Sequence, residues 1–285
     1  METARSHVDK YRIPNLAKAC GVLALLAPRR TGMTPSEVAR HLSMPRTTAF
    51  RVLRTLCGEG LLEESEGRYR AGPGLLRLGL MAVETAELPA QAEPVLHALA
   101  QQTGETAHLA IRAGDRMLIA AVCDSPNPIR VASRPGTLVL MHCAATGKAV
   151  LAGLSAEAVR ALLPGPKFER RTERTLTTPA ALERELEAIR RQGYAVDDGE
   201  YHDGVRCLAA PVFNARGEAT AAIGITAAAA RFTKRRLPSV ARDVKHAAEA
   251  LSVAMGRTPT GGAAPARAGL RETRDVSGSI PVLEE

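Results

Sequence analysis

The sequence predicts an α+β protein with two domains joined by a short helix. Helical patterns of apolar residues, followed by a β-hairpin pattern, fill the first 73 residues. The segment "AGPG" and a leucine-rich run, "LLRLGL", come next, and beyond them strand and helix patterns alternate to about Gly256. We therefore expect an N-terminal arm, a first domain, a linker helix, a second domain and a disordered tail, over residues 1–13, 14–73, 74–88, 89–256 and 257–285.

The composition is that of a soluble globular protein, with 45% hydrophobic and 24% charged residues over 285 positions. No apolar run approaches the roughly 18 residues of a membrane span, and the N-terminus lacks the apolar core of a secretory signal. The five cysteines are scattered and form no zinc-binding pattern with the histidines. We expect reduced thiols, a cytoplasmic location, no metal and no cofactor.

Positive charge is concentrated near the N-terminus. The formal net charge is +8, and residues 1–54 hold 10 lysines and arginines against 3 aspartates and glutamates. A cluster of this sign on one short domain is typical of a protein that binds a polyanion.

Three helices and a hairpin are expected in the first domain, in that order. The first helix spans about 15–27, where an apolar stripe ends before Pro28. The second begins at "TPSE", in which Thr34 caps the helix and Glu37 completes a capping box. The third follows a tight "SMP" turn and spans about 45–58, and "LLEESEGRYRAG" then indicates two short strands around a Glu-Gly turn.

The third helix has two unlike faces. One face is apolar and anchors the helix to its predecessors, through Ala49, Val52, Leu53 and Leu56 at helical spacing. The opposite face carries arginines and threonines, with no carboxylate before Glu59. A generic solvated helix would mix charges of both signs, so this face is suited to a negatively charged partner.

The order of helices, turn and hairpin is that of a winged helix-turn-helix, whose third helix enters the major groove of DNA. Arginine can read guanine there, while threonine and phenylalanine can contact a thymine methyl group, and hairpin arginines can contact phosphates. For a single hydroxyl such as that of Thr48 or Thr55, a bond to the backbone or to water is an equal alternative. The candidate DNA-binding residues are Arg46, Thr47, Thr48, Phe50, Arg51 and Arg54 on the helix and Arg68 and Arg70 in the hairpin.

The sequence of the second domain predicts an α/β sheet of the GAF-like sensor type, with strands joined mainly by hairpins. The turns "AGD" and "NARG" each join two apolar or alternating segments. One helix follows "MHC", and another is capped by Thr178 and ended by Gly193. The expected strands span 106–112, 117–123, 207–213 and 219–226, and the first of these helices spans 144–154.

Two segments of this domain are suited to binding a small anion or its hydroxyl groups. In "HCAATGK", the free N–H groups of the first helical turn, at Ala145, Thr146 and Gly147, can receive a carboxylate. In "YAVDDGEYHDGVRC", Asp197 after a strand can accept a hydrogen bond from a ligand hydroxyl. Gly224 and Thr226 lie two apart, on one strand face, and are further candidates.

The sequence resembles the isocitrate-lyase-regulator (IclR) family of bacterial transcription factors over roughly residues 14–256. The resemblance lies in "MTPSEVARHLSMPRTTAFRVLRTLCGEGLL", "GRYRAGPGLLRLG", "TGETAHLAIRAGDRMLIAAV", "MHCAATGKAVLAGL" and "RRQGYAVDDGEYHDGVRCLAAPVFNARGEATAAIGIT". It implies a homodimer or dimer of dimers, paired partly through the linker helix, on a near-palindromic double-stranded DNA operator. It also implies an effector-binding domain, with contacts at Ala145, Thr146, Asp197, Cys207, Gly224 and Thr226.

The resemblance favours a repressor that responds to an organic acid or aromatic metabolite. Phe50 departs from the family pattern, which more often has histidine there, and the tail is not a family feature. We expect no enzymatic activity. The alternatives are a cysteine-dependent hydrolase that uses the adjacent His142 and Cys143 with Asp197, and a DNA-binding protein without a ligand.

Several residues near these motifs also have structural interpretations. Cys143 and Cys207 are more often core residues than ligand-binding ones. Asp198 and Glu200 are interpreted as loop decoration, and His142 as a packed or hydrogen-bonded histidine.

Overall fold

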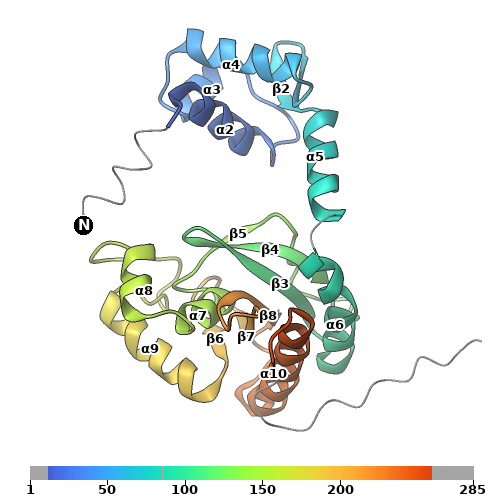
Figure 1. Ribbon diagram of the computed structural model, residues 1–285, viewed down its shortest axis with the longest axis vertical. Helices are drawn as coiled ribbons and strands as arrows, with labels where there is room; N and C mark the ends of the chain where they lie inside the picture. The colour runs from blue at the N-terminus through green and yellow to red at the C-terminus, as the bar shows by residue number, and fades with distance from the viewer. Residues whose placement is uncertain (1–11, 85–86, 259–285) are drawn as a thin grey trace, which may run out of the picture. The chain divides into compact units, whose positions relative to one another are not determined.

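The computed structural model describes residues 12–84 and 87–258 (Figure 1). The chain divides into two compact units, 1–93 and 94–285. Helices and antiparallel sheets are present in the predicted order, which confirms the α+β fold class. The expected N-terminal arm and C-terminal tail lie almost wholly outside the described residues. Within those residues no helix is long and apolar enough to cross a membrane.

The first unit contains the predicted helices and hairpin. They are α2 (Pro14–Leu26), α3 (Pro35–His41), α4 (Arg46–Gly58), β1 (Leu62–Ser65) and β2 (Arg68–Ala71). The capping box is confirmed: Thr34 N donates to Glu37 Oε2 at 2.7 Å, and Glu37 N donates to Thr34 Oγ1 at 3.3 Å. Because both bonds satisfy N–H groups that the helix itself leaves free, they fix where α3 begins.

The core of this unit lies between α2, α3 and the inner face of α4. Leu53 of α4 is fully buried with Val22 of α2 and Val38 of α3. The hairpin is joined to this core by two backbone hydrogen bonds, Met33 N to Tyr69 O at 2.9 Å and Tyr69 N to Met33 O at 2.8 Å. The hairpin is therefore held at the start of α3, beside the outer face of α4.

The linker differs from the prediction of one helix over 74–88. Helix α5 (Pro73–Glu84) is followed by a second helix, α6 (Glu87–Thr103), which begins inside the expected linker. Pro89 lies in the first turn of α6, where a missing N–H costs nothing, and the helix also tolerates Pro94. On α5, at least half of each of four apolar side chains is exposed: Leu76, Leu78, Leu80 and Met81.

The second unit is built on a six-stranded antiparallel sheet in the order β5-β4-β3-β8-β7-β6. The strands are β3 (Thr106–Ala113), β4 (Arg116–Cys123), β5 (Leu138–Leu140), β6 (Ala195–Asp198), β7 (Val205–Phe213) and β8 (Ala219–Ala228). Both predicted hairpins are present, and β7 and β8 extend slightly beyond their predicted ends. The short strand β5 was not predicted, and the strand expected before Asp197 is β6, which includes Asp197 and Asp198.

Helices pack on this sheet around its central strands. They are α7 (Ala145–Ala152), α8 (Ala156–Leu162), α9 (Pro179–Gln192), the 3₁₀ turn η1 (Lys234–Arg236) and α10 (Leu237–Ala254). Helix α7 packs on β7 and β8, α9 packs on α7, and α10 also packs on β7 and β8 (Figure 1). The predicted ends of α9 are confirmed: Thr178 Oγ1 accepts from Ala181 N at 3.3 Å, and Gly193 ends the helix at φ 80°.

Two glycines allow unusually close packing around α7 and β8. A Cβ on Gly224 of β8 would lie 2.3 Å from Leu208 O and 2.9 Å from Ala209 Cα. A Cβ on Gly147 of α7 would lie 2.3 Å from Met141 Cα. Because these neighbours are backbone atoms that cannot rotate away, any side chain would push the elements apart.

We predict that Gly224→Ala lowers the free energy of unfolding of the second domain by about 1–3 kcal/mol, through overpacking. Urea denaturation followed by circular dichroism measures the change. Gly79→Ala in α5 is the control, because within the described residues a Cβ at that position would have no neighbour within 4 Å, and alanine favours a helix. A Gly224→Ala protein as stable as wild type would contradict the packing explanation.

Candidate functional site

The outer face of α4 borders an open groove in the first unit. Arg46, Thr47, Phe50, Arg51 and Arg54 line it, together with the start of α3 and the hairpin. Half of the Phe50 side chain is exposed. Within the described residues, none of the three arginines forms an ion pair, so their charge is available to a partner.

Thr48 and Thr55, whose hydroxyls could bond either to a base or to the backbone or water, have different surroundings. Thr55 Oγ1 donates to Arg51 O at 2.9 Å, so its hydroxyl is bonded to the helix backbone. Thr48 is half-buried and does not line the groove.

The two hairpin arginines are held by contacts within the first unit. Arg68 donates to Thr31 O at 3.1 Å and Gly32 O at 3.2 Å, and its Nη2 lies 3.3 Å from Glu37 Oε2. Arg70 Nε donates to Glu63 Oε1 at 2.6 Å. Both side chains remain about half exposed.

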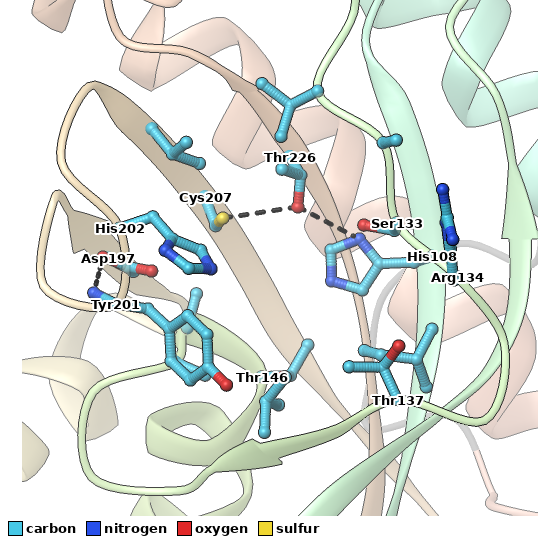
Figure 2. Close-up of a pocket in the computed structure, with 17 residues that line it drawn as sticks. His108, Ser133, Arg134, Thr137, Thr146, Asp197, Tyr201, His202, Cys207 and Thr226 are labelled. Atoms are coloured by element: carbon cyan, nitrogen blue, oxygen red, sulfur yellow. Dashed lines mark hydrogen bonds between the residues drawn. The ribbon is translucent and has the colours of Figure 1, made fainter. Parts of the chain in front are cut away.

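A second candidate site is a cavity of about 240 Å³ in the second unit. Its walls are the sheet face, the start of α7 and the segments around residues 131–137 and 201–205 (Figure 2). Of the residues predicted to contact a ligand, the cavity brings together Ala145, Thr146, Asp197, Cys207 and Thr226. Gly147 and Gly224 do not line it; their contacts with Met141 and Leu208 give them a packing role instead.

Three neighbouring strands place a row of polar side chains across the cavity. Cross-strand pairing sets Asp197 opposite Cys207, and Cys207 opposite Thr226. Thr226 Oγ1 lies 3.3 Å from Cys207 Sγ and 3.5 Å from His108 Nδ1 (Figure 2). Burial lowers the pKa of His108 to about 4, so its imidazole is neutral at pH 7.

Asp197 is a buried carboxylate held by backbone donors. Its Oδ1 accepts from Glu200 N at 2.6 Å and from Tyr201 N at 3.2 Å. Burial raises the pKa of Asp197 to about 6, against the lowering effect of these bonds and of Lys148. Burial of the charged form therefore outweighs the bonds that stabilise it.

The interpretation of Glu200 as loop decoration is wrong. Glu200 is buried and forms an ion pair with Lys148, whose side chain is completely buried in α7. Glu185 lies 3.4 Å from the same ammonium group. Asp198 likewise has a partner, because Arg206 Nε donates to its Oδ1 at 2.7 Å. A buried lysine is stable only when paired, so this ion pair fixes the β6–β7 connection against α7.

The start of α7 faces the cavity without a capping side chain. Its N-cap is Ala144, which cannot accept a bond from the first-turn N–H groups. Thr146 is 2% exposed and lines the cavity, yet within the described residues its hydroxyl has no hydrogen-bond partner. Unpartnered polar groups at a helix N-terminus form a site suited to an anion.

Several cavity residues were not predicted from the sequence: His108, Ser133, Arg134, Thr137, Tyr201 and His202. His108 lies inside β3, and Ser133, Arg134 and Thr137 lie in the β4–β5 connection. Tyr201 and His202 follow Asp197 in the quoted segment "YAVDDGEYHDGVRC". The sheet order brings β3 beside β8 and so sets His108 next to Thr226. No local motif marks the three residues of the β4–β5 connection, whereas Tyr201 and His202 lie only four and five residues beyond the predicted Asp197.

The residues of the alternative hydrolase do not form a catalytic arrangement. His142 Nε2 is 2.9 Å from Glu169 O, which matches its interpretation as a hydrogen-bonded histidine. Cys143 is completely buried, and burial raises the pKa of its thiol to about 12. A neutral, inaccessible thiol is not a nucleophile. Neither residue lines the cavity.

Comparison with known proteins gives matches over both units. Residues 15–66 match the IclR helix-turn-helix domain, and residues 80–253 match the bacterial transcriptional regulator IclR C-terminal family. The chain is 36% identical over 249 residues to the transcriptional regulator BhcR of Paracoccus denitrificans, covering 87% of this chain and 89% of that one. It is 32% identical over 258 residues to KdgR of Escherichia coli, covering 89% and 97%.

Solved structures agree with these matches. An IclR transcriptional regulator from Alicyclobacillus acidocaldarius has a TM-score of 0.77 at 29% identity, covering 86% of this chain and 100% of that one. IclR from Thermotoga maritima has a TM-score of 0.66 at 28% identity, with the same coverage of 86% and 100%. These relatives are regulators and not enzymes. The C-terminal family model covers more than half of this chain, and the helix-turn-helix model covers the domain that precedes it. This chain therefore belongs to the IclR family of transcriptional regulators.

Proposed function

We propose that this protein is a cytoplasmic repressor whose binding to a near-palindromic operator is controlled by a small organic acid in the second-domain cavity. The observation that carries this proposal is the start of α7, where uncapped N–H groups and the unpartnered Thr146 hydroxyl face the cavity. A regulator needs a ligand site separate from its DNA-reading surface, and this cavity supplies one.

The DNA-reading surface in this proposal is the outer face of α4. Its unpaired arginines can donate to guanine, and the exposed ring of Phe50 can pack on a thymine methyl group. Arg68 and Arg70 use some of their donors inside the domain, and the remaining guanidinium N–H groups can contact phosphates. Two such domains, paired through the exposed leucines of α5, would read the two half-sites of the operator. Contacts between effector-binding second domains could then join two dimers into a tetramer.

The ligand in this proposal places a carboxylate on the first turn of α7 and a hydroxyl or carbonyl group among the polar residues of the sheet. Asp197 supports this assignment because its buried carboxylate destabilises the fold in the absence of a ligand. Groups that cost stability are typical of binding sites. Regulation follows if the acid binds the DNA-free state more tightly than the DNA-bound state.

We predict that Arg51→Ala weakens operator binding by about 1–3 kcal/mol and relaxes sequence preference, because a base contact is lost. Fluorescence anisotropy with operator and random duplexes measures both effects. Arg242→Ala in α10, exposed and outside the groove, is the control. An equal loss on both duplexes would show a phosphate contact instead.

Thr146→Val should weaken binding of an acid effector by about 1.5–3 kcal/mol, the cost of losing a hydrogen bond to a charged group. The melting temperature should not fall, since within the described residues the wild-type hydroxyl faces the cavity and makes no hydrogen bond that the variant would lose. A thermal-shift screen of carboxylic acids and aromatic metabolites identifies the effector, and calorimetry compares the two proteins. Unchanged affinity would remove Thr146 from the binding site.

Asp197→Asn should stabilise the protein at pH 8 but not at pH 4. The native pKa of Asp197 is about 6, above its ordinary value of 3.8, so the folded state binds the proton more tightly. Stability from this group is therefore lost as pH rises from about 4 to about 6, by up to about 3 kcal/mol. Asparagine keeps the acceptor for Glu200 N and Tyr201 N without the charge.

Urea denaturation of both proteins at each pH measures this difference. A variant that is less stable than wild type at pH 8 would show that the Asp197 charge is stabilising and would contradict the assignment.

A further inference from the structure

We propose that the cavity is built for a dicarboxylate, with one carboxylate on the first turn of α7 and the other on Arg134. This inference rests on the proposed function, because it assigns the chemical class of the acid effector. It adds a specificity-determining residue, Arg134, that the sequence motifs do not contain.

Arg134 is the one lysine or arginine among the described residues that lines the cavity. It lies in the connection between β4 and β5, and within the described part of the chain its guanidinium has no ion pair or hydrogen bond. The neighbouring Arg130, in contrast, is paired with Asp124 at 2.8 Å. An unpaired guanidinium at the edge of a ligand cavity is suited to bidentate binding of a carboxylate.

The charges of the cavity are separated in space. Figure 2 shows Arg134 beside Ser133 and His108, while Asp197 lies at the opposite side with Tyr201 and His202. A carboxylate at Arg134 therefore avoids the buried acid. The neutral imidazole of His108, on β3 beside Arg134, can donate or accept a hydrogen bond without adding charge (Figure 2).

The two anion-binding elements lie in different walls. Thr146 belongs to α7, and Figure 2 shows it away from Arg134, below the His108 ring. We assign each wall a carboxylate of its own, so a monoacid bound on α7 leaves Arg134 without a partner. A diacid satisfies the helix N-terminus and the guanidinium together, and its chain crosses the apolar surface of Ile119 and Val139.

Calorimetry on the full-length protein can test the assignment with succinate, glutarate and adipate against butanoate, pentanoate and hexanoate, the monoacids of matching length. We expect at least one diacid to bind wild type about tenfold or more tightly than its monoacid. Arg134→Ala should remove that preference and leave monoacid affinity unchanged, while Arg134→Lys should restore part of it. Arg130→Ala is the matched control and should behave as wild type.

The outcomes separate this inference from the proposed function. Equal binding of diacids and monoacids by wild type, or equal losses of both in Arg134→Ala, would overturn the role of Arg134 and leave an acid effector in place. A wild-type protein that binds no acid of either series would overturn the dicarboxylate assignment. If Thr146→Val also left every effector response unchanged, the proposed carboxylate site on α7 would be overturned as well.

Discussion

The second domain depends on one buried ion pair, between Lys148 and Glu200. Every residue of α7 is buried, so the helix has no solvated face on which a charge could rest. A lysine in such a helix requires a carboxylate partner, and Glu200 supplies it from the β6–β7 connection. The same connection donates the N–H groups of Glu200 and Tyr201 to Asp197. Removal of the pair would therefore release the cavity wall as well as the helix.

The first domain places the packing face and the proposed DNA-reading face on opposite sides of a single helix. The inner face of α4 gives the packing energy through Leu53 and its neighbours, which are fully buried. Its outer face then needs no carboxylates for stability and can carry unpaired arginines. The repulsion among those arginines is a cost that a phosphate backbone relieves.

Patterns of neighbouring residues predicted most helices and strands. Contacts between segments far apart in the sequence determined which residues line the cavity. The capping box at Thr34 and the ends of α9 follow from neighbouring residues, so the sequence was sufficient for them. Arg134 and His108 could not be assigned, because only the sheet order brings them to α7. Gly224 was assigned to the ligand because it shares a strand face with Thr226, and a glycine there would leave space for one. The structure fills that space with the backbone of Leu208.

The attachment of the hairpin has a consequence for the shape of the bound DNA. The paired bonds between Met33 and Tyr69, together with the bonds of Arg68 to Thr31 and Gly32, fix the hairpin to the start of α3. In the proposed complex, the hairpin and α4 would therefore meet a duplex as one surface. Any mismatch in groove width must be absorbed by bending of the DNA, whose energy depends on base steps that the protein never touches. The flexibility of an operator would then contribute to its selection alongside its bases.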